Sequence, residues 1–394
     1  MNMATKNDIF QEFLKEYLAN NRGGKGKILD HVTAVTKMHR KAVIRKFAAK
    51  QMKDPCEQEG RGRKTYYTPD VTSALKTLWQ AANEPCGELL HPMIFEYVTI
   101  LRRDGMWLDE LRNPHSDATT IKLLAMSAET VRRRVSKFLK VRGKKRGISA
   151  TRPSHLKAII PIFKGPWRGL SPGHCQLDTV AHCGNTLLGD FIYSVNATES
   201  ATYWLVLRAQ WNKGQRATVE SMKEMQRRLP IRWLGAHPDT GSEFINWVAK
   251  EWFDSENIDL TRSEPGKKND NMYVEERNGH VVRKYLGYLR LDDPLLVPLV
   301  NEMYEVLADY LNHFQAVRRT IEKKRVGAKY VRKYEKIAKT PYQRMLEHSE
   351  VPVDTKQELR NKHEQLNPLL LKQQIDTLLT RMMKNRSMRM PPKR

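Results

Sequence analysis

Three carboxylates, Asp178, Asp239 and Glu275, have the residue types needed to hold divalent metal ions. Magnesium and manganese are hard cations that prefer oxygen ligands, and Mg²⁺ takes one or two carboxylates together with phosphate oxygens. Two such ions about 4 Å apart can stabilise both the attacking and the leaving oxygen of an in-line displacement at phosphorus. The chemistry that these acids could support is therefore metal-dependent cleavage or transfer of phosphodiesters.

Spacing alone is weak support for such a site. The three acids are separated by 60 and then 35 residues, and a chain with 44 acidic residues among 394 gives several acid pairs at any chosen separation by chance. The prediction therefore depends on the local sequence around each acid and on the elements that this sequence predicts.

The elements around the first acid read as a meander of three strands. Residues 174–184 alternate between apolar and polar types with Asp178 in the middle, and further strands are predicted at 191–198 and 201–208. A helix with apolar residues at helical spacing is predicted from Lys213 to Arg228. Asp178 should therefore lie in the middle of a half-buried strand.

The second and third acids fall at a strand end and on a helix. The apolar run 231–236 leads to Asp239, and Ser242 is the predicted N-cap of the helix that follows. In open α/β sheets, ligands bind at the carboxyl ends of strands. A short strand at 258–262 then precedes a helix at 272–285, on which Glu275 shares a face with Asn278 and Val282.

Three phrases carry a resemblance to a known family. They are Gln-Leu-Asp178-Thr-Val, His-Pro-Asp239-Thr-Gly-Ser-Glu-Phe and Asn-Asp-Asn-Met-Tyr-Val-Glu275-Glu-Arg-Asn-Gly. Residues 172–290 resemble the catalytic core of retroviral integrases and bacterial insertion-sequence transposases, and the phrases at 310–315 and 339–344 match the transposase tail. The resemblance implies a central α/β RNase H-like core, a mixed five-stranded sheet with flanking helices.

The resemblance also implies the roles of the three acids. Asp178 would bridge two Mg²⁺ or Mn²⁺ ions, Asp239 would complete one site and Glu275 the other, and the ions would relieve the repulsion between the carboxylates. Asn278 would face the DNA end rather than the metal. Glu276 directly follows Glu275, so the choice of the third ligand depends on helix phase and on the preceding Val274.

The function implied is that of a DNA transposase or integrase. Such a protein binds double-stranded DNA at element ends, cleaves at the 3′ end and transfers the strand into target DNA, working as a dimer or tetramer on paired ends. Two alternatives stay open: an RNase H-like nuclease that hydrolyses without joining, and a domesticated DNA-binding regulator whose core is inactive.

The charge of the chain supports a nucleic-acid partner. The formal net charge is +25 and the sequence pI is about 9.8, which favours binding to polyanions. Residues 130–177 contain 13 Lys or Arg and no acid, and residues 318–344 contain 11 Lys or Arg against Glu322 and Glu335. These runs flank the predicted metal site on both sides. Phosphate contacts of this kind supply affinity without base discrimination.

Two segments predict elements that could read base sequence. Residues 27–47 and 119–139 each read as a short helix, a tight turn and a second basic helix, with Ser127 as the predicted N-cap in the second pair. This pattern is typical of a helix-turn-helix, whose second helix enters the major groove. The alternative is an ordinary helical hairpin with a basic solvent face. Between the pairs, Gly60 to Lys64 reads as a linker that could follow phosphates or enter the minor groove.

The predicted organisation has five parts: an N-terminal helix-turn-helix at 1–58, a second all-α DNA-binding domain at 59–150, a basic linker at 151–171, the catalytic core at 172–317 and a basic C-terminal region with a terminal helix at 318–394. The candidate DNA contacts are basic or polar residues spread over these parts: His39, Arg40, Lys41, Arg45, Arg61, Arg63, Lys64, Arg132, Arg133, Arg134, Lys144, Lys145, Arg146, Lys267, Lys268, Asn278, Arg283, Lys284, Lys323, Lys324 and Arg325.

Cysteine usage is low, at four residues, and nothing in their positions suggests a disulfide framework. The dipeptides at 174–175 and 182–183 combine His and Cys, but structural zinc sites usually take ligands in close pairs on a turn, so no zinc is expected. No signal peptide and no apolar run of about 18 residues is found. The chain is therefore expected to be cytoplasmic and nucleoid-associated in a bacterium, with no membrane partner.

Overall fold

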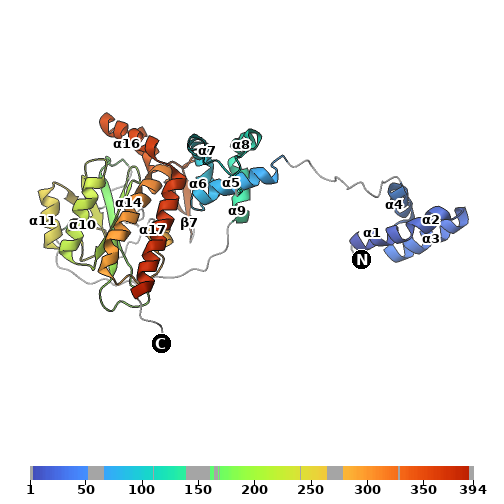
Figure 1. Ribbon diagram of the computed structural model, residues 1–394, viewed down its shortest axis with the longest axis horizontal. Coiled ribbons are helices and arrows are strands. Elements are labelled where there is room, and N and C mark those ends of the chain that lie inside the picture. Colours follow the sequence, from blue (N-terminus) through green and yellow to red (C-terminus); the bar gives the residue numbers. More distant parts are fainter. Residues whose placement is uncertain are drawn as a thin grey trace. The chain divides into compact units, whose positions relative to one another are not determined.

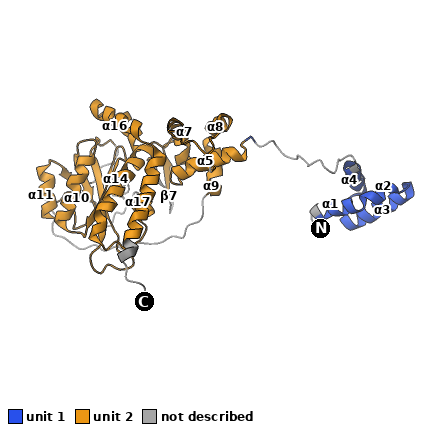
Figure 2. Cartoon of the chain, in the orientation of Figure 1, with its two compact units in different colours: residues 1–66 blue, residues 67–394 orange. Residues whose placement is uncertain are grey.

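The structure, a computed structural model, describes residues 3–51, 66–109, 111–138, 160–163, 167, 169–239, 241–263, 278–326 and 329–389. The chain forms two compact units, residues 1–66 and residues 67–394 (Figure 2). Each unit has a hydrophobic core of its own. Among the described residues, no helix is both long enough and apolar enough to cross a lipid bilayer.

The first unit is a small bundle of four helices: α1 (Met3–Glu12), α2 (Leu14–Ala19), α3 (Arg22–Thr36) and α4 (Arg40–Gln51). Its core contains the side chains of Phe10, Val32 and Phe47, which are fully buried. The turn between α3 and α4 is three residues long and begins with Lys37 in the left-handed conformation (φ 54°). The expected pair of helices around a tight turn is therefore present in this segment.

The second unit is built on a five-stranded mixed sheet, which confirms the expected sheet (Figure 1). The strands are β1 (His174–Ala181), β2 (Ile192–Glu199), β3 (Leu205–Trp211), β4 (Gly235–Pro238) and β5 (Asp259–Leu260), in the order β3-β2-β1-β4-β5. The first three strands form an antiparallel meander, whereas β4 is parallel to β1 and β5 is parallel to β4. This arrangement is consistent with an RNase H-like core.

Helices cover both faces of the sheet (Figure 1). On one face, Leu177 and Val195 pack with apolar residues of α10 (Gln215–Arg228) and α11 (Trp247–Ser255). On the other face, Val180 and Leu207 pack with α14 (Val297–Phe314) and, through it, with α17 (Pro368–Arg389). The terminal helix, which the sequence predicts, buries Ile375 and Met382 in this core.

The helices from α5 to α9 belong to the same hydrophobic core as α14 and α17. Their bounds are α5 Pro69–Ala81, α6 Gly87–Leu90, η1 His91–Met93, α7 Ile94–Arg103, α8 Asp117–Leu124 and α9 Ala128–Phe138. The hydroxyl of Tyr310 on α14 donates to the carbonyl of Ala81 at 2.7 Å. The segment predicted to be one domain at 59–150 is thus divided near residue 66, and its described helices share a hydrophobic core with α14 and α17.

The remaining elements follow the sheet in the chain. A π-helical turn, η3 (Asn278–Val282), leads into α13 (Arg283–Leu286), and a 3-10 turn, η4 (Pro294–Leu296), precedes α14. The basic segment after α14 forms an antiparallel hairpin of β6 (Thr320–Val326) and β7 (Lys329–Tyr334). It is followed by α15 (Pro341–Glu347) and α16 (Val353–Gln365).

Two local predictions differ from the structure. The third strand begins at Leu205 rather than at residue 201, because the buried carboxylate of Glu199 accepts hydrogen bonds from the backbone of Ala201 (3.0 Å) and Thr202 (2.6 Å) and folds a turn there. The N-cap of α11 is Asn246, whose side chain accepts from Ala249 N, and not Ser242. By contrast, Ser127 does accept from Thr130 N at the start of α9, as expected.

Buried histidines make the fold sensitive to acid. Burial lowers the pKa of His182 and His313 to about 3 and that of His237 to about 4, because the charged imidazolium loses its hydration. In the unfolded chain these groups take up protons near pH 6.5. The unfolded state therefore binds more protons below that pH, and the stability present above it is lost as the pH falls toward 4 and 3.

We expect replacement of His182 by Gln to flatten the pH dependence of the free energy of unfolding. Between pH 6 and pH 4, each such histidine contributes a slope of up to about 1.4 kcal/mol per pH unit. Denaturant unfolding at several pH values measures this slope. The exposed His280 provides the control, since its replacement by Gln should leave the slope unchanged. A slope that is equal in the wild type and the His182 variant contradicts the assignment.

Candidate active site at the ends of strands β1 and β4

Asp178 lies in the middle of β1, at the point where the neighbouring strand β4 ends. Its Oδ1 accepts a hydrogen bond from the backbone of Thr179 at 2.7 Å, and its Oδ2 accepts one from Asn278 Nδ2 at 2.6 Å. The residue is partly buried and pairs across the sheet with Asn196 on β2. Two hydrogen-bond donors therefore fix the orientation of this partly exposed carboxylate.

Asp239 is the residue directly after β4. The last pair in the parallel register of the two strands is Leu177 with Pro238, so the next residues, Asp178 and Asp239, are neighbours across the sheet. Adjacent strands lie about 4.8 Å apart. Asp239 Oδ1 accepts from the backbone of Gly241 at 2.7 Å. Two of the three predicted acids are therefore brought together by the sheet.

Asn278 completes a polar chain that runs from β2 to Asp178. Its Oδ1 accepts from Asn196 Nδ2 at 3.0 Å while its Nδ2 donates to Asp178. This side chain is predicted to face the DNA end, whereas in the structure its amide group donates a hydrogen bond to the first predicted metal ligand. The third predicted ligand, Glu275, lies outside the described residues, together with Glu276.

A fourth acid, Glu243, adjoins the two aspartates, and the sequence analysis missed it. Its residue surface is 3% exposed, its Oε1 accepts from Thr179 Oγ1 at 2.8 Å, and Lys213 Nζ lies 2.9 Å from its Oε2. The lysine contact is an ion pair defined by charge and distance rather than an aligned hydrogen bond. The sequence does contain a signal for this residue: Glu243 belongs to the phrase that starts at His237, and it directly precedes the apolar residues Phe244 and Ile245.

The donor set suits a hard divalent cation. Asp178 and Asp239 are neighbours across the sheet, and carboxylate oxygens are ligands that Mg²⁺ and Mn²⁺ prefer in proteins. Within the described ranges, no three His, Cys, Asp or Glu side chains are arranged to enclose a metal ion. The pair formed by Asp178 and Asp239 can therefore supply part of a metal site, and a further ligand has to come from elsewhere.

The His-Cys dipeptides have structural environments. His182 Nε2 lies 2.7 Å from Ser194 Oγ, and Cys175 and Cys183 are buried as free thiols. His174 is partly buried at the start of β1. These side chains are spread along β1 and just beyond it, and they face different neighbours.

The predicted DNA contacts on α4 and directly before it are exposed. Arg40, Lys41 and Arg45 reach solvent on the second helix of the first pair, and His39 does so in the turn before it. Arg40 also pairs with Asp30 on α3 at 2.9 Å. This helix therefore presents a basic face.

The core residues Arg283 and Lys284 make internal hydrogen bonds. Arg283 donates to the carbonyl of Ala181 at 2.9 Å, which ties α13 to the end of β1, and Lys284 donates to the carbonyl of Asn83 at 2.6 Å. Both side chains thus connect elements of the second unit.

The remaining predicted contacts cannot be placed as side chains. Three of them, Lys323, Lys324 and Arg325, belong to β6, but the structure does not describe their side chains. The other predicted contacts lie outside the described residues: Arg61, Arg63, Lys64, Lys144, Lys145, Arg146, Lys267 and Lys268.

The three arginines of α9 have different environments. Arg133 is 74% exposed and pairs with Glu129 at 2.8 Å, and Arg132, 51% exposed, pairs with the same carboxylate at 2.7 Å. Arg134 turns inward: it donates to Thr72 Oγ1 and to the carbonyl of Tyr67, and its guanidinium lies over the Tyr67 ring. Only the first two present charge to solvent.

We expect the Arg133→Ala and Arg134→Ala variants to separate DNA binding from stability. Loss of Arg133 should leave the free energy of unfolding within about 0.5 kcal/mol of wild type, and should lower DNA affinity with a reduction of about 1 in its salt slope. Loss of Arg134 removes hydrogen bonds to a charged group and should destabilise the unit by about 1.5–3 kcal/mol. Thermal unfolding and fluorescence anisotropy with a DNA duplex at several salt concentrations measure both. Equal stability of the two variants contradicts the distinction.

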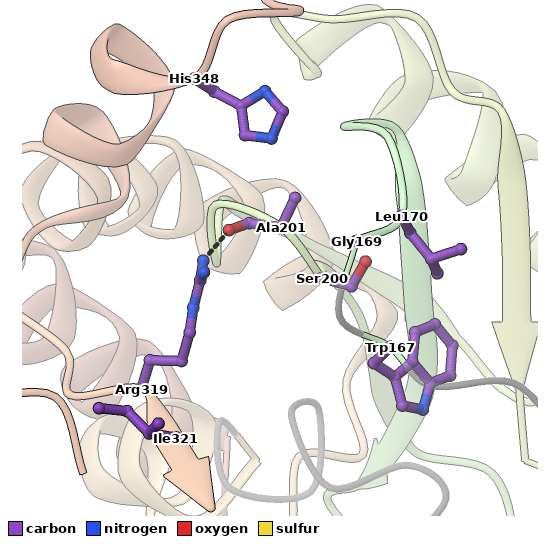
Figure 3. Close-up of a pocket in the computed structure, with 8 residues that line it drawn as sticks. All are labelled: Trp167, Gly169, Leu170, Ser200, Ala201, Arg319, Ile321 and His348. Atoms are coloured by element: carbon purple, nitrogen blue, oxygen red, sulfur yellow. Dashed lines mark hydrogen bonds between the residues drawn. The ribbon is translucent and has the colours of Figure 1, made fainter.

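A pocket of about 280 Å³ lies near the opposite end of β1 (Figure 3). It is formed by the segment before β1, the turn after β2, the start of β6 and the end of α15; its lining residues are Trp167, Gly169, Leu170, Ser200, Ala201, Arg319, Ile321 and His348. Arg319 donates to the carbonyl of Ala201. None of the predicted site residues lines this pocket.

The fold and the site define a protein with a mixed five-stranded sheet and two adjacent aspartates, one on β1 and one at the end of β4. No protein-family model matches the chain. Over 339 residues the sequence is 32% identical to an uncharacterized protein, y4rM, of Sinorhizobium fredii (strain NBRC 101917 / NGR234), and the match covers 85% of this chain and 93% of that protein. The chain belongs to the family of this rhizobial protein.

Solved structures of retroviral integrases overlap part of the second unit. A chain of the simian T-cell lymphotropic virus intasome, in complex with PP2A regulatory subunit B56 gamma, has a TM-score of 0.31 at 21% identity over 38% of this chain and 52% of that one. The HTLV-2 integrase catalytic core domain, in complex with magnesium, has a TM-score of 0.28 at 17% identity over 38% of this chain and 93% of that one. TM-scores this low do not define a fold, which is given instead by the strand order.

Proposed function

We propose that this protein is a DNA transposase or integrase, a metal-dependent polynucleotidyl transferase that cleaves element ends at the 3′ strand and joins them to target DNA. The observation that carries the proposal is the juxtaposition of Asp178, in the middle of β1, with Asp239, directly after the end of β4, together with the hydrogen bond from Asn278 to Asp178. These residues lie in the phrases that resemble the family signature.

The residues that would hold two Mg²⁺ or Mn²⁺ ions are Asp178, Asp239 and Glu275. When bound, such ions stabilise charge on the attacking and leaving oxygens of the phosphodiester. The protein itself orients the ligands: the backbone of Thr179 and the amide of Asn278 hold the Asp178 carboxylate, and the backbone of Gly241 holds that of Asp239. Metal ligands that are fixed by hydrogen bonds of this kind bind more tightly than free ones.

The basic surfaces would hold the DNA. In the first unit, the exposed side chains of α4 are placed for a helix-turn-helix contact, and in the second unit Arg132 and Arg133 of α9 present charge on the second helix of another pair. Two such readers suit a long double-stranded site at an element end. Joining two ends further requires a dimer or tetramer, and the expected location is the bacterial cytoplasm and nucleoid.

A strand-transfer assay tests the proposal. The full-length chain is incubated with Mg²⁺ or Mn²⁺, a target plasmid and labelled duplexes taken from the DNA that flanks its gene, where inverted repeats mark the element ends. The expected result is covalent linkage of the label to the plasmid, dependent on metal. Release of label without linkage supports a nuclease instead, and binding without cleavage supports a regulator with an inactive core; either result overturns the proposal.

A further inference from the structure

The ion pair between Lys213 and Glu243 joins a partly exposed lysine to a buried glutamate beside strand β1. The Glu243 side chain is 2% exposed and that of Lys213 is 32% exposed. Removing charges from water carries a penalty that the attraction between them often fails to offset, so well-packed apolar residues at such positions are frequently as stable or more stable. Stability alone therefore does not account for a charged pair at this place.

Glu243 is connected to the first predicted metal ligand through one residue. Thr179 donates its hydroxyl to Glu243 Oε1 at 2.8 Å, and its backbone N–H donates to Asp178 Oδ1 at 2.7 Å. A movement of the glutamate would therefore change the rotamer of Thr179 and the backbone that orients the Asp178 carboxylate.

Glu243 is also in close proximity to the second predicted ligand. A Cβ atom added to Gly241 would lie 2.5 Å from Glu243 Oε2 and 2.7 Å from Asp239 Oδ1, so both oxygens border the same small space. The position has room for these two carboxylate ends because residue 241 has no side chain. Glu243 thus contacts Thr179, the chain neighbour of Asp178, and its Oε2 borders the same small space as Asp239 Oδ1.

The charge on Glu243 would disturb this arrangement without a cation. Carboxylates that lie near one another repel, and a nearby cation relieves this repulsion. The ammonium of Lys213, 2.9 Å from Glu243 Oε2, offsets one of the three charges. It also lies beside the oxygen that borders Gly241, so one glutamate oxygen accepts a hydrogen bond from Thr179 and the other is in an ion pair with Lys213.

We propose that Glu243 and Lys213 form a neutral buried pair that positions Asp178 and Asp239 for divalent cation binding. Glu243 is a positioning residue: it holds Thr179 by a hydrogen bond and limits the space beside Gly241 that the Asp239 carboxylate can occupy. Lys213 keeps Glu243 from binding the cation as a ligand itself. This inference rests on the proposed function for its catalytic meaning, but it concerns metal affinity, which is measurable without DNA.

Titration of the full-length chain with Mn²⁺ alone, followed by electron paramagnetic resonance or calorimetry, tests the pair. The Glu243→Gln variant should bind Mn²⁺ 10- to 100-fold more weakly, the range found when groups that orient metal ligands are removed. The Thr179→Val variant, which loses the hydroxyl and keeps the shape, should also bind Mn²⁺ more weakly than wild type. Thr179→Ser keeps the hydroxyl and should bind Mn²⁺ with wild-type affinity. Unchanged affinity in both Glu243→Gln and Thr179→Val overturns the inference.

The chain offers a matched control. Lys223 and Glu220 on α10 form a pair at 2.8 Å whose side chains are 40% and 68% exposed, and Glu220→Gln should leave Mn²⁺ affinity unchanged. Should Glu243→Gln fail to fold, the double variant with Lys213→Met removes both charges together and avoids an unpaired buried ion. The double variant should fold and bind Mn²⁺ at least ten-fold more weakly; wild-type affinity there overturns the inference.

The two proposals fail in different ways. A wild-type chain that binds Mn²⁺ through Asp178 and loses affinity in Glu243→Gln, yet joins no DNA, removes the proposed function and keeps the positioning role. A chain that joins DNA while Glu243→Gln keeps full Mn²⁺ affinity removes the positioning role alone. A wild-type chain that binds no divalent cation removes both.

Discussion

Replacement of Asp178 by Asn should reduce DNA cleavage and joining by more than about 10³-fold, equivalent to at least about 4 kcal/mol of lost transition-state stabilisation. The carboxylate is the predicted bridging ligand, and an amide has the same shape but carries no charge to hold a second cation. The side-chain amide of the Asp178→Asn variant would also have an N–H donor at the position where the carboxylate accepts from Asn278. This hydrogen bond could form only if the amide of Asn278 flipped to present its oxygen. The strand-transfer assay in Mg²⁺ measures the loss.

DNA binding by this variant should remain close to wild type, because the phosphate contacts lie on other elements. Anisotropy with the end duplex measures the affinity, and thermal unfolding verifies that the sheet is intact. The Asp190→Asn variant is the control, since Asp190 is an exposed acid in the connection between β1 and β2 and its loss should leave joining unchanged. Joining at the wild-type rate by the Asp178 variant would sink the assignment of the catalytic acids.

Much of the sheet could be predicted from the sequence because its signals are local. Alternation around Asp178 and apolar runs before Asp239 specify strands, and their order along the chain gives the meander. The pairing of β4 beside β1 is not local, since it brings together residues some 60 positions apart. That the helices α5 to α9 share a core with α14 and α17 depends on long-range burial, which the pattern of a single helix does not specify.

The same distinction applies to the site. Asp178 and Asp239 stand in recognisable phrases, so their residue types and approximate places could be predicted. The bond from Asn278 to Asp178 could not, because the rotamer of an amide depends on both Asp178 and Asn196 at once. Glu243 was missed since an acid before Phe244 reads as the exposed position of an amphipathic segment, whereas its burial depends on Lys213, 30 residues earlier in the chain.

Gly241 is the position where the smallest substitution should have a large catalytic effect. A methyl group there would lie 2.5 Å from Glu243 Oε2 and 2.7 Å from Asp239 Oδ1, well inside van der Waals contact. Both atoms are ends of side chains, so they can move, but the movement displaces a predicted metal ligand. A displacement of about 1 Å at a reacting centre can lower the rate by about 10²-fold, and we expect Gly241→Ala to reduce joining by that amount.

The stability of Gly241→Ala should change little. Gly241 does not require a left-handed backbone, and Ala restricts the unfolded chain by about 0.4–1 kcal/mol, which offsets part of the cost of moving two side-chain ends. The control is Gly279→Ala beside Asn278, where a Cβ would meet no atom within 4 Å, so joining should stay within about two-fold of wild type. Joining rates and unfolding midpoints of both variants measure the effect. Full activity of Gly241→Ala would mean that the Asp239 carboxylate tolerates displacement, and hence that it does not hold a metal ion in a fixed geometry.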